Sequence, residues 1–438
     1  MSKKNEQSVR KITTQVIPIM LVFTMVLAAC GAPTATQAPA PTQAPVATSA
    51  PAVTAAPAAT AASSTSAASP IKIGQLSDMT STFTPWGLNV RDGMALAAKE
   101  INDAGGENGR MIQIIVEDSQ NKGDTGVTRY EQLVQDGVVA VGGIISSGVG
   151  VPVAADAEKL HVPVFLVKSG DAAALTKESK YTFRTCLPAA PMVAQPILQF
   201  AKQQGFTKVG AIVADYPWGH SIQAALQNTF KDSGITLDIE VAPVPPTTDF
   251  TPYVRKMADF GAQLIVSTGH PPGTGAIVSL SADLAGNVPV TGAWTPPDLS
   301  VGGMKDQAIG RFSDFSCADY TSDSYAQLAK SYLASSNNKF MSDDAVAGYA
   351  IVKIVAQAVG AVGDDPTAIA QYIHSNTFNE PGYAHPLSWT AWGELAASAP
   401  IFYQIDAGPA PEGLNKAGTW WLKVLSHSEP LTPYEPPQ

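Results

Sequence analysis

From residue 70 onward the chain alternates short apolar segments with longer amphipathic ones. Residues 71–76 show the period-two alternation of a strand, and the apolar positions that follow, up to residue 101, recur at helical spacing. The same reasoning predicts further strands and helices in alternation. The strands are expected at 111–117, 138–145, 162–167, 208–214, 263–268 and 288–291, and the helices near 127–134, 149–160 and 191–204.

The alternation predicts an α/β protein made of two Rossmann-like lobes with parallel sheets. The almost wholly apolar segment 138–145 is typical of a strand in a sheet that is covered on both faces. Ligands of open parallel sheets bind beyond the carboxyl ends of the strands, so two facing lobes would form a cleft. We expect three short extended crossings between the lobes, at 181–185, at 311–317 and near 373–378. The first lobe is then 70–184 plus 318–372, and the second lobe is 185–317 plus 373–438.

The N-terminal region has the pattern of an export signal. Four basic side chains within the first eleven residues precede an apolar run that ends at Leu27-Ala28-Ala29-Cys30. A charged head, an apolar middle and small residues at the cut predict a signal peptide over residues 1–29. The cysteine resembles the lipobox of bacterial lipoproteins, which implies that Cys30 is diacylated. A transmembrane helix needs about 20 apolar residues, and this run is shorter and contains Pro18.

Residues 30–69 are expected to be a linker that begins with the lipidated cysteine. The segment after Cys30 has no charged and no aromatic side chain, so it cannot bury enough apolar surface to fold. Loss of the signal peptide removes four basic groups and one acidic group, which changes the formal net charge from −10 to −13. This balance argues against nucleic acid and against an anionic membrane surface as partners.

A series of motifs resembles the leucine/isoleucine/valine-type periplasmic binding proteins. No single motif decides the assignment, but their number and order cover nearly all of residues 71–375. The resemblance implies the type I periplasmic binding protein fold with three hinge crossings, and a solute-binding role for an ABC importer. The motifs are Ile71-Lys72-Ile73-Gly74, Glu100-Ile101-Asn102-Asp103-Ala104-Gly105, Val116-Glu117-Asp118, Gly142-Gly143-Ile144-Ile145-Ser146-Ser147-Gly148, Val162-Pro163-Val164, Phe183-Arg184-Thr185, Thr248-Asp249-Phe250, and Asp344-Ala345 with Gly348-Tyr349.

Two pairs of small residues are candidates for binding a ligand carboxylate. Ser146 and Ser147 end one strand and begin a helix, where free N–H groups and partial positive charge favour an anion. A serine at this place commonly only caps the helix, but the family has a ligand-binding serine there. Ser169 and Gly170 follow the next strand, where the resemblance implies the rest of the anion site.

Aromatic side chains in loops at strand ends are expected to form the other walls of the cleft. A single loop aromatic is more often a packing residue than a ligand contact, whereas several that converge would form a stacking box. The candidates are Phe83, Trp86, Trp218, His270, Trp294 and, as a weaker member, Tyr320.

One departure from the family pattern bears on the ligand. Amino-acid binders of this type have an acidic residue after the strand at 288–291, where this chain has Gly292-Ala293-Trp294-Thr295. A buried ammonium without a partner is strongly disfavoured. Unless Asp78, Asp215 or Asp298 supplies the charge, we expect an aromatic or organic acid rather than an α-amino acid.

The remaining residues indicate no enzyme, metal or cofactor. Motifs of serine hydrolases, zinc peptidases and phosphate-binding loops are absent from the sequence, and the six histidines are dispersed. Cys186 and Cys317 lie beside two expected crossings and either form a disulfide or remain unpaired.

The leading hypothesis is a monomeric, lipid-anchored, extracytoplasmic receptor for a small carboxylate that presents its closed form to ABC permease subunits. A ligand sensor of the same fold for a signalling receptor is the first alternative. An envelope-anchored hydrolase is the second, and the absent motifs disfavour it.

Overall fold

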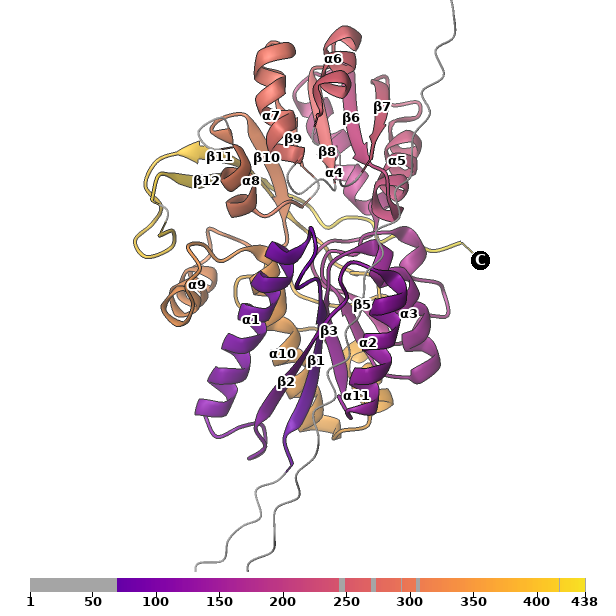
Figure 1. Cartoon of the computed structure of the whole chain (residues 1–438), viewed down its shortest axis with the longest axis vertical. Coiled ribbons are helices and arrows are strands. Elements are labelled where there is room, and N and C mark those ends of the chain that lie inside the picture. The colour runs from indigo at the N-terminus through magenta and orange to yellow at the C-terminus, as the bar shows by residue number, and fades with distance from the viewer. Residues whose placement is uncertain are drawn as a thin grey trace, which may run out of the picture. The chain divides into compact units, whose positions relative to one another are not determined.

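The structure is a computed structural model that describes residues 69–243, 249–268, 273–292, 294–304, 308–416 and 418–437. These residues form two sheets, each with its own packed helices (Figure 1). We call the five-stranded sheet with its helices the first lobe, and the seven-stranded sheet with its helices the second lobe.

The first lobe is an all-parallel sheet in the order β2-β1-β3-β4-β5. Its strands are β1 (Ile71–Ser77), β2 (Ile112–Asp118), β3 (Ala140–Ile144), β4 (Val164–Leu166) and β5 (Thr182–Arg184). Its helices are α1 (Thr84–Asp103), α2 (Gly123–Gln135), α3 (Ser147–Leu160), the 3₁₀ helix η1 (Ala172–Ala174), α9 (Asp323–Ser335), α10 (Asp343–Val362) and α11 (Pro366–Ser375). These bounds confirm the strand and helix alternation predicted for this part of the chain.

Helices cover both faces of the first sheet. α1 packs with α10 and α2 packs with α3, and each pair also contacts the strands. Ile71 and Ile73 of β1 belong to one apolar cluster, and Leu76 belongs to another. The continuous apolar pattern of β3 therefore has the predicted cause, since both of its faces are buried.

The α1–α10 pair is close enough to require glycine. A Cβ atom at Gly93 would meet the backbone carbonyl of Ala345, and one at Gly348 would meet that of Val90. Among the described helices, α10 alone is long and apolar enough to cross a membrane, but 72% of that apolar window is buried within the protein. Burial of this kind is typical of a core helix.

The second lobe is a mixed sheet in the order β12-β11-β10-β9-β8-β6-β7. Its strands are β6 (Lys208–Ala214), β7 (Thr236–Ala242), β8 (Leu264–Thr268), β9 (Val290–Thr291), β10 (Phe312–Ser316), β11 (Ile401–Ala407) and β12 (Trp420–His427). Its helices are α4 (Ala190–Gln203), α5 (Pro217–Phe230), α6 (Thr251–Phe260), α7 (Gly273–Leu284) and α8 (Pro297–Met304). The strands from β6 to β10 are parallel, and the tail adds β11 and β12 as an antiparallel hairpin.

The segments expected as crossings differ from simple extended connections. Residues 181–185 contain β5 and residues 311–317 contain β10, so these segments pair with a sheet, and the chain changes lobe directly after each strand. These segments pair with a sheet because pairing gives their backbone N–H and C=O groups hydrogen-bond partners, which a free extended connection would lack. The third expected crossing is also different, because α11 continues to Ser375 and the second sheet is reached only at Ile401.

The last residues contact both lobes. We call residues 428–437 the C-terminal strap. Gln195 of α4 donates a hydrogen bond to the carbonyl of Thr432 at 3.2 Å, while Lys177, which precedes β5, pairs with Glu435 at 2.8 Å. The strap is therefore a further connection between the lobes.

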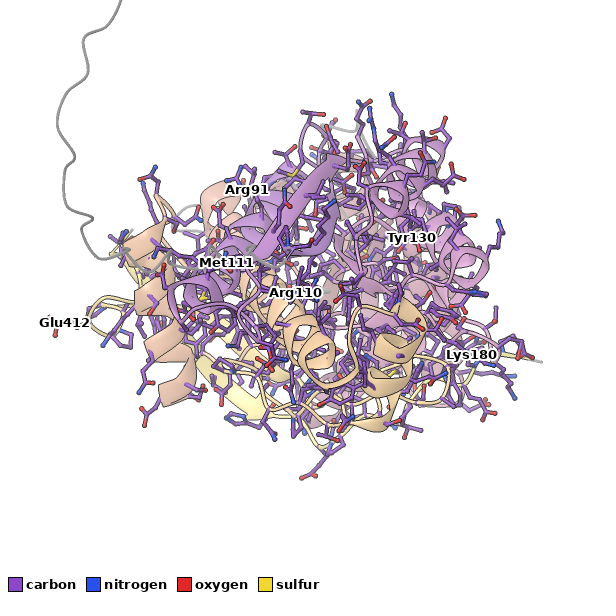
Figure 2. The ribbon with its side chains drawn as sticks, turned by 90° about the horizontal axis from the view of Figure 1, so that it is seen from below. Arg91, Arg110, Met111, Tyr130, Lys180 and Glu412 are labelled. Carbon is purple, nitrogen blue, oxygen red and sulfur yellow. A yellow bond between two sulfur atoms is a disulfide. The ribbon has the colours of Figure 1, made fainter. Side chains whose placement is uncertain are left out.

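The parallel strands of the first lobe begin at the end that faces the viewer in Figure 2. Arg110 precedes β2 and Lys180 precedes β5, and both lie at this end (Figure 2). The carboxyl ends of these strands therefore lie at the opposite end of the sheet, where α3 contacts α5 of the second lobe.

Candidate functional site

Loops at the carboxyl ends of strands from both lobes touch each other. The rings of Phe83, before α1, and Tyr216, before α5, have centroids 6.1 Å apart. Gly170 lies so close to Trp218 that a Cβ atom would overlap the indole ring. The backbone N–H of Ala172 donates to Ser221 Oγ at 3.0 Å. The facing strand ends of the two lobes are thus in direct contact in this structure.

The predicted aromatic residues that the structure describes are all buried. Among the described residues, the ring contacts of Phe83 and Trp86, of Trp294, and of Tyr320 form three separate groups. Phe83 and Trp86 pack edge to face at 5.7 Å, near Tyr216, while Trp294 stacks on Phe315 at 5.3 Å. Tyr320 packs against other aromatic rings beside β10. His270 lies outside the described residues.

The predicted serines make hydrogen bonds within the first lobe. Ser146 is the N-cap of α3, and its Oγ accepts from the N–H of Gly148 at 3.2 Å. Ser147 Oγ accepts from the N–H of Asp171 at 3.2 Å. The Ser169 side chain lies against Gly150 of α3, and its hydroxyl is buried without a hydrogen-bond partner.

A carboxylate of the chain itself lies at the expected anion site. Asp78, at the end of β1, is 1% exposed and accepts from Ser119 Oγ at 2.5 Å. It also accepts backbone hydrogen bonds from Asn121 and Ser146. Burial raises the pKa of Asp78, although these hydrogen bonds oppose the effect. A carboxyl group of the chain therefore lies beside the N–H of Ser146, which was expected to help bind a ligand carboxylate.

Lys168, which lies two residues after the buried strand β4, was not among the residues predicted from the sequence. Its ammonium donates to the Trp294 carbonyl at 3.0 Å and to Asp343 Oδ2 at 2.8 Å, and lies 3.6 Å from Asp344 Oδ1. Its side chain is 5% exposed. Burial lowers the pKa of Lys168, but the charges of the two aspartates outweigh burial and raise it. Lys168 thus joins the end of β4 to α10 and to the loop after β9.

Asp314 of β10 supplies a carboxylate beneath the loop that follows β9. It accepts from the backbone N–H groups of Trp294 at 2.9 Å, Thr295 at 2.7 Å and Phe315 at 2.7 Å. A side chain at Gly292 would overlap the Asp314 carboxyl group. The Asp314 carboxyl group therefore holds the backbone of the loop that follows β9.

Lys168, Asp298, Asp314, Asp343 and Asp344 form what we call the buried charge cluster. Burial raises the pKa of Asp298 and of Asp314 to about 7, and raises that of Asp344 well above its usual range. Asp343 Oδ1, both oxygens of Asp344 and Asp298 Oδ1 are buried without hydrogen-bond partners. The cluster contains four acids and one base, which lie on α8, β10, α10 and the loop after β4.

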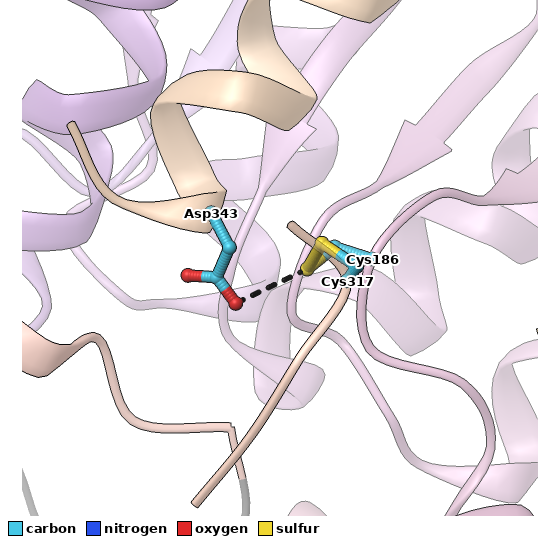
Figure 3. Close-up of side chains that lie close together, drawn as sticks. All are labelled: Cys186, Cys317 and Asp343. Carbon is cyan, nitrogen blue, oxygen red and sulfur yellow. Dashed lines mark hydrogen bonds between the residues drawn. A yellow bond between two sulfur atoms is a disulfide. The ribbon is translucent and has the colours of Figure 1, made fainter. Parts of the chain in front are cut away.

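The two remaining cysteines form a disulfide, Cys186–Cys317, across a sequence separation of 131 residues. Cys186 follows β5 and Cys317 follows β10, so the bond ties two of the connections between the lobes. Asp343 Oδ2 lies 3.4 Å from Cys186 Sγ (Figure 3). Because the sulfurs are bonded to each other, these three side chains do not offer thiolate ligands to a metal.

The sequence contained a partial indication of the residues of the buried charge cluster that were not predicted as site residues. Asp344 belongs to a motif that the resemblance singled out, and Asp343 and Asp344 are both buried at the start of α10. The pattern did not show their proximity to Lys168, because the two segments are 175 residues apart. A lysine shortly after a buried strand was the one local indication.

Comparison with known proteins gives a consistent result. A family model described as periplasmic binding protein matches residues 70–409. The Leu/Ile/Val-binding protein BraC3 of Rhizobium johnstonii is 24% identical over 345 residues, which is 77% of this chain and 92% of that protein. A solute-binding protein of an ABC transporter from R. palustris, solved with benzoate, has a TM-score of 0.70 at 17% identity and covers 84% of this chain and 98% of its own. The branched-chain amino acid binding protein LivJ of Streptococcus pneumoniae, solved with isoleucine, has a TM-score of 0.66 at 22% identity, with 82% and 99% coverage.

Proposed function

Because this chain belongs to the periplasmic binding protein family, of the Leu/Ile/Val-binding kind, we propose that it is the extracytoplasmic solute-binding component of an ABC importer. The observation that carries the proposal is the meeting of the two lobes through buried polar side chains. Lys168, at the end of β4, donates to the carbonyl of Trp294 after β9. Polar groups at facing strand ends are suited to enclose a small solute.

The permease would recognise the protein in its closed form, with the solute bound. A solute that contacts both lobes stabilises only the closed form, so it shifts the population towards closure. The connections after β5 and β10, which the disulfide joins, would absorb the change as hinges. Of the lobe boundaries deduced from the sequence, those after residues 184 and 317 remain part of this proposal, whereas the one expected between 372 and 373 falls inside α11 of the first lobe.

The proposal includes a lipid anchor at Cys30, which lies outside the described residues together with the signal peptide at 1–29. Cys30→Ser is expected to release the exported chain from the membrane and to abolish labelling by a radioactive fatty acid. A Ser63→Ala variant, within the linker, is the control and should remain labelled. Unchanged membrane association of Cys30→Ser without lipid labelling would contradict the anchor.

Solute binding can be tested on the mature chain in detergent by thermal shift. The panel would contain amino acids, aromatic and aliphatic carboxylates, amines and amides. A solute at 100 times its dissociation constant adds about 2.7 kcal/mol of stability, which a melting curve resolves. Cells without the gene should then lose uptake of the same solute. Normal uptake in such cells, or hydrolysis of an amide or ester by the purified chain, would contradict an import role.

A further inference from the structure

We propose that the hairpin of β11 and β12 is a clasp, which holds the segment between α9 and α10 and so keeps the two lobes together before a solute binds. We call residues 336–342 of that segment the α9–α10 loop. The hairpin belongs to the second sheet, whereas α9 and α10 pack on α1 in the first lobe. This role goes beyond the proposed function, because it concerns how easily the lobes separate rather than which solute they bind.

The first contact is made by Lys416, in the turn between β11 and β12. Its backbone N–H donates to the carbonyl of Lys339 at 2.8 Å, and its ammonium donates to the carbonyl of Leu333. Leu333 lies in the last turn of α9, where carbonyl groups lack partners within the helix and carry partial negative charge. That turn of α9 contains no basic residue of its own. A lysine of the second lobe therefore caps a helix of the first lobe.

The second contact is aromatic. Phe340 of the α9–α10 loop is 2% exposed, and its ring centroid lies 5.2 Å from that of Trp420 and 6.0 Å from that of Trp421. Leu414, in the same turn as Lys416, is also buried. Buried aromatic rings contribute large apolar areas, so this contact stabilises the clasp more than the exposed lysine does.

The aromatic contact continues to the loop that follows β9. The ring of Tyr320, in the first lobe, packs at 5.6 Å from Phe340 and at 5.8 Å from Tyr403 of β11. The Tyr403 hydroxyl donates to the Thr295 carbonyl at 3.1 Å. The hairpin is thus connected both to the first lobe and to a loop of the second lobe at the interface.

Separation of the lobes acts on these contacts because their two sides belong to different lobes. β11 is paired with β10 and with β12, so the hairpin moves with the second sheet. The α9–α10 loop moves with the first lobe, since α9 and α10 pack on α1. The hairpin and α9 lie on the side of the molecule away from the C-terminus, and α3 meets α5 on the other side (Figure 1). Contacts thus hold the lobes on both sides, and a rotation that separates the lobes breaks at least one set.

The test measures the distance between the lobes in the mature chain, in detergent and dialysed free of solute. Nitroxide labels on Lys99→Cys of α1 and Lys256→Cys of α6, whose side chains are 62% and 58% exposed, report this distance by pulsed electron paramagnetic resonance. Cys186 and Cys317 are bonded to each other and Cys30 carries the proposed lipid, so none of them takes up the label. The chain should show mainly one short distance, that of the closed lobes. Mainly long distances in the wild-type chain would overturn the clasp.

Three variants remove the clasp from its two sides. Phe340→Ala and Trp420→Ala delete the aromatic contact, and each should raise the ratio of open to closed chains about tenfold or more. The double variant should raise the ratio by less than the product of the two single effects, because both changes remove one shared contact. Lys416→Ala should raise the ratio by a smaller factor, and it carries the test should an aromatic variant fail to fold. Wild-type distances in the folded variants would overturn the clasp.

Two control variants separate the clasp from general stability. Lys423→Ala changes an exposed lysine of the same hairpin, on β12, and should leave the distances unchanged. Phe230→Ala deletes a buried aromatic ring of α5 and should lower the melting temperature without a change in the distances. A shift towards long distances in Phe230→Ala equal to that in Trp420→Ala would overturn the clasp, since loss of any buried ring would then have the same effect.

The outcome is separate from that of the proposed function. A wild-type chain that is open without solute and still binds a solute of the panel would overturn the clasp and leave the import role intact. A chain that behaves as a clasped protein, but binds no solute of the panel and is not required for uptake, would contradict the import role and support the clasp.

Discussion

Asp314 shows how a buried acid can make stability depend on pH. Burial raises its pKa to about 7 from a usual value near 3.8, despite its three backbone hydrogen bonds. Between these two pH values the unfolded chain has released the proton and the native chain still holds it. The unfolded state then binds fewer protons, so the free energy of unfolding falls as the pH rises from about 4 to about 7.

Asp314→Asn should therefore flatten part of this pH dependence. Across the range, the wild-type protein is expected to lose roughly 4 kcal/mol more unfolding free energy than the variant. Denaturant titrations at several pH values between 4.5 and 7.5 would measure the difference. Parallel curves for the two proteins would show that Asp314 ionises normally.

Arg184 and Glu394 form an ion pair in which both side chains are fully buried. Glu394→Ala would leave the guanidinium buried without its partner, which costs roughly 3–5 kcal/mol of stability. Glu435→Ala is the matched control, because Glu435 is 65% exposed in its pair with Lys177 and should change stability by less than about 1 kcal/mol. Equal losses in the two variants, measured by chemical denaturation, would contradict this account.

Among the helices, α1 and α10 depend on a close approach at Gly93. A methyl group there would meet the Ala345 carbonyl, and backbone cannot move aside as a flexible side chain can. Gly93→Ala should destabilise the protein by about 1–3 kcal/mol or more. Ala95→Val, on the exposed side of the same helix, should cost less than about 1 kcal/mol. A melting temperature of Gly93→Ala equal to that of the wild type would refute the close contact.

Elements with strong periodicity could be predicted from the sequence, and short ones could not. The hydrophobic pattern of β1, α1 and β3 can be recognised in the local sequence, because the burial of each face is consistent along the element. β5 and β10 were expected as crossings since three to five extended residues look alike in a strand and in a linker. Their pairing partners lie on other elements, and hydrogen bonding to those partners decides the structure.

The candidate site was only partly predictable for the same reason. Ser146 and Trp294 could be placed because each follows a recognisable strand. The residues of the buried charge cluster lie on the loop after β4 and on α8, β10 and α10, and no local pattern in the sequence links Lys168 to Asp343. Such an arrangement depends on how the two lobes meet, which is a property of the whole fold.

At the scale of the whole molecule, the disulfide Cys186–Cys317 closes a loop of more than one hundred residues. Replacing both cysteines by serine should lower the unfolding free energy by roughly 2–5 kcal/mol, since the cross-link restricts the unfolded chain. Denaturation with and without dithiothreitol measures the effect, and the double-serine variant is the control that should not respond to the reductant. An unchanged wild-type midpoint in reductant would contradict a structural role.

The C-terminal strap has a practical consequence for anyone who produces this protein. Gln195 and Lys177 hold it to the two lobes, and Trp392 donates to the Tyr434 carbonyl at 3.0 Å. An affinity tag fused after residue 438 would thus be attached to a segment that contacts both lobes, and we expect its bulk to disturb these contacts. A small fluorophore on the strap would instead be useful as a probe, because the surroundings of the dye would change if the lobes separated.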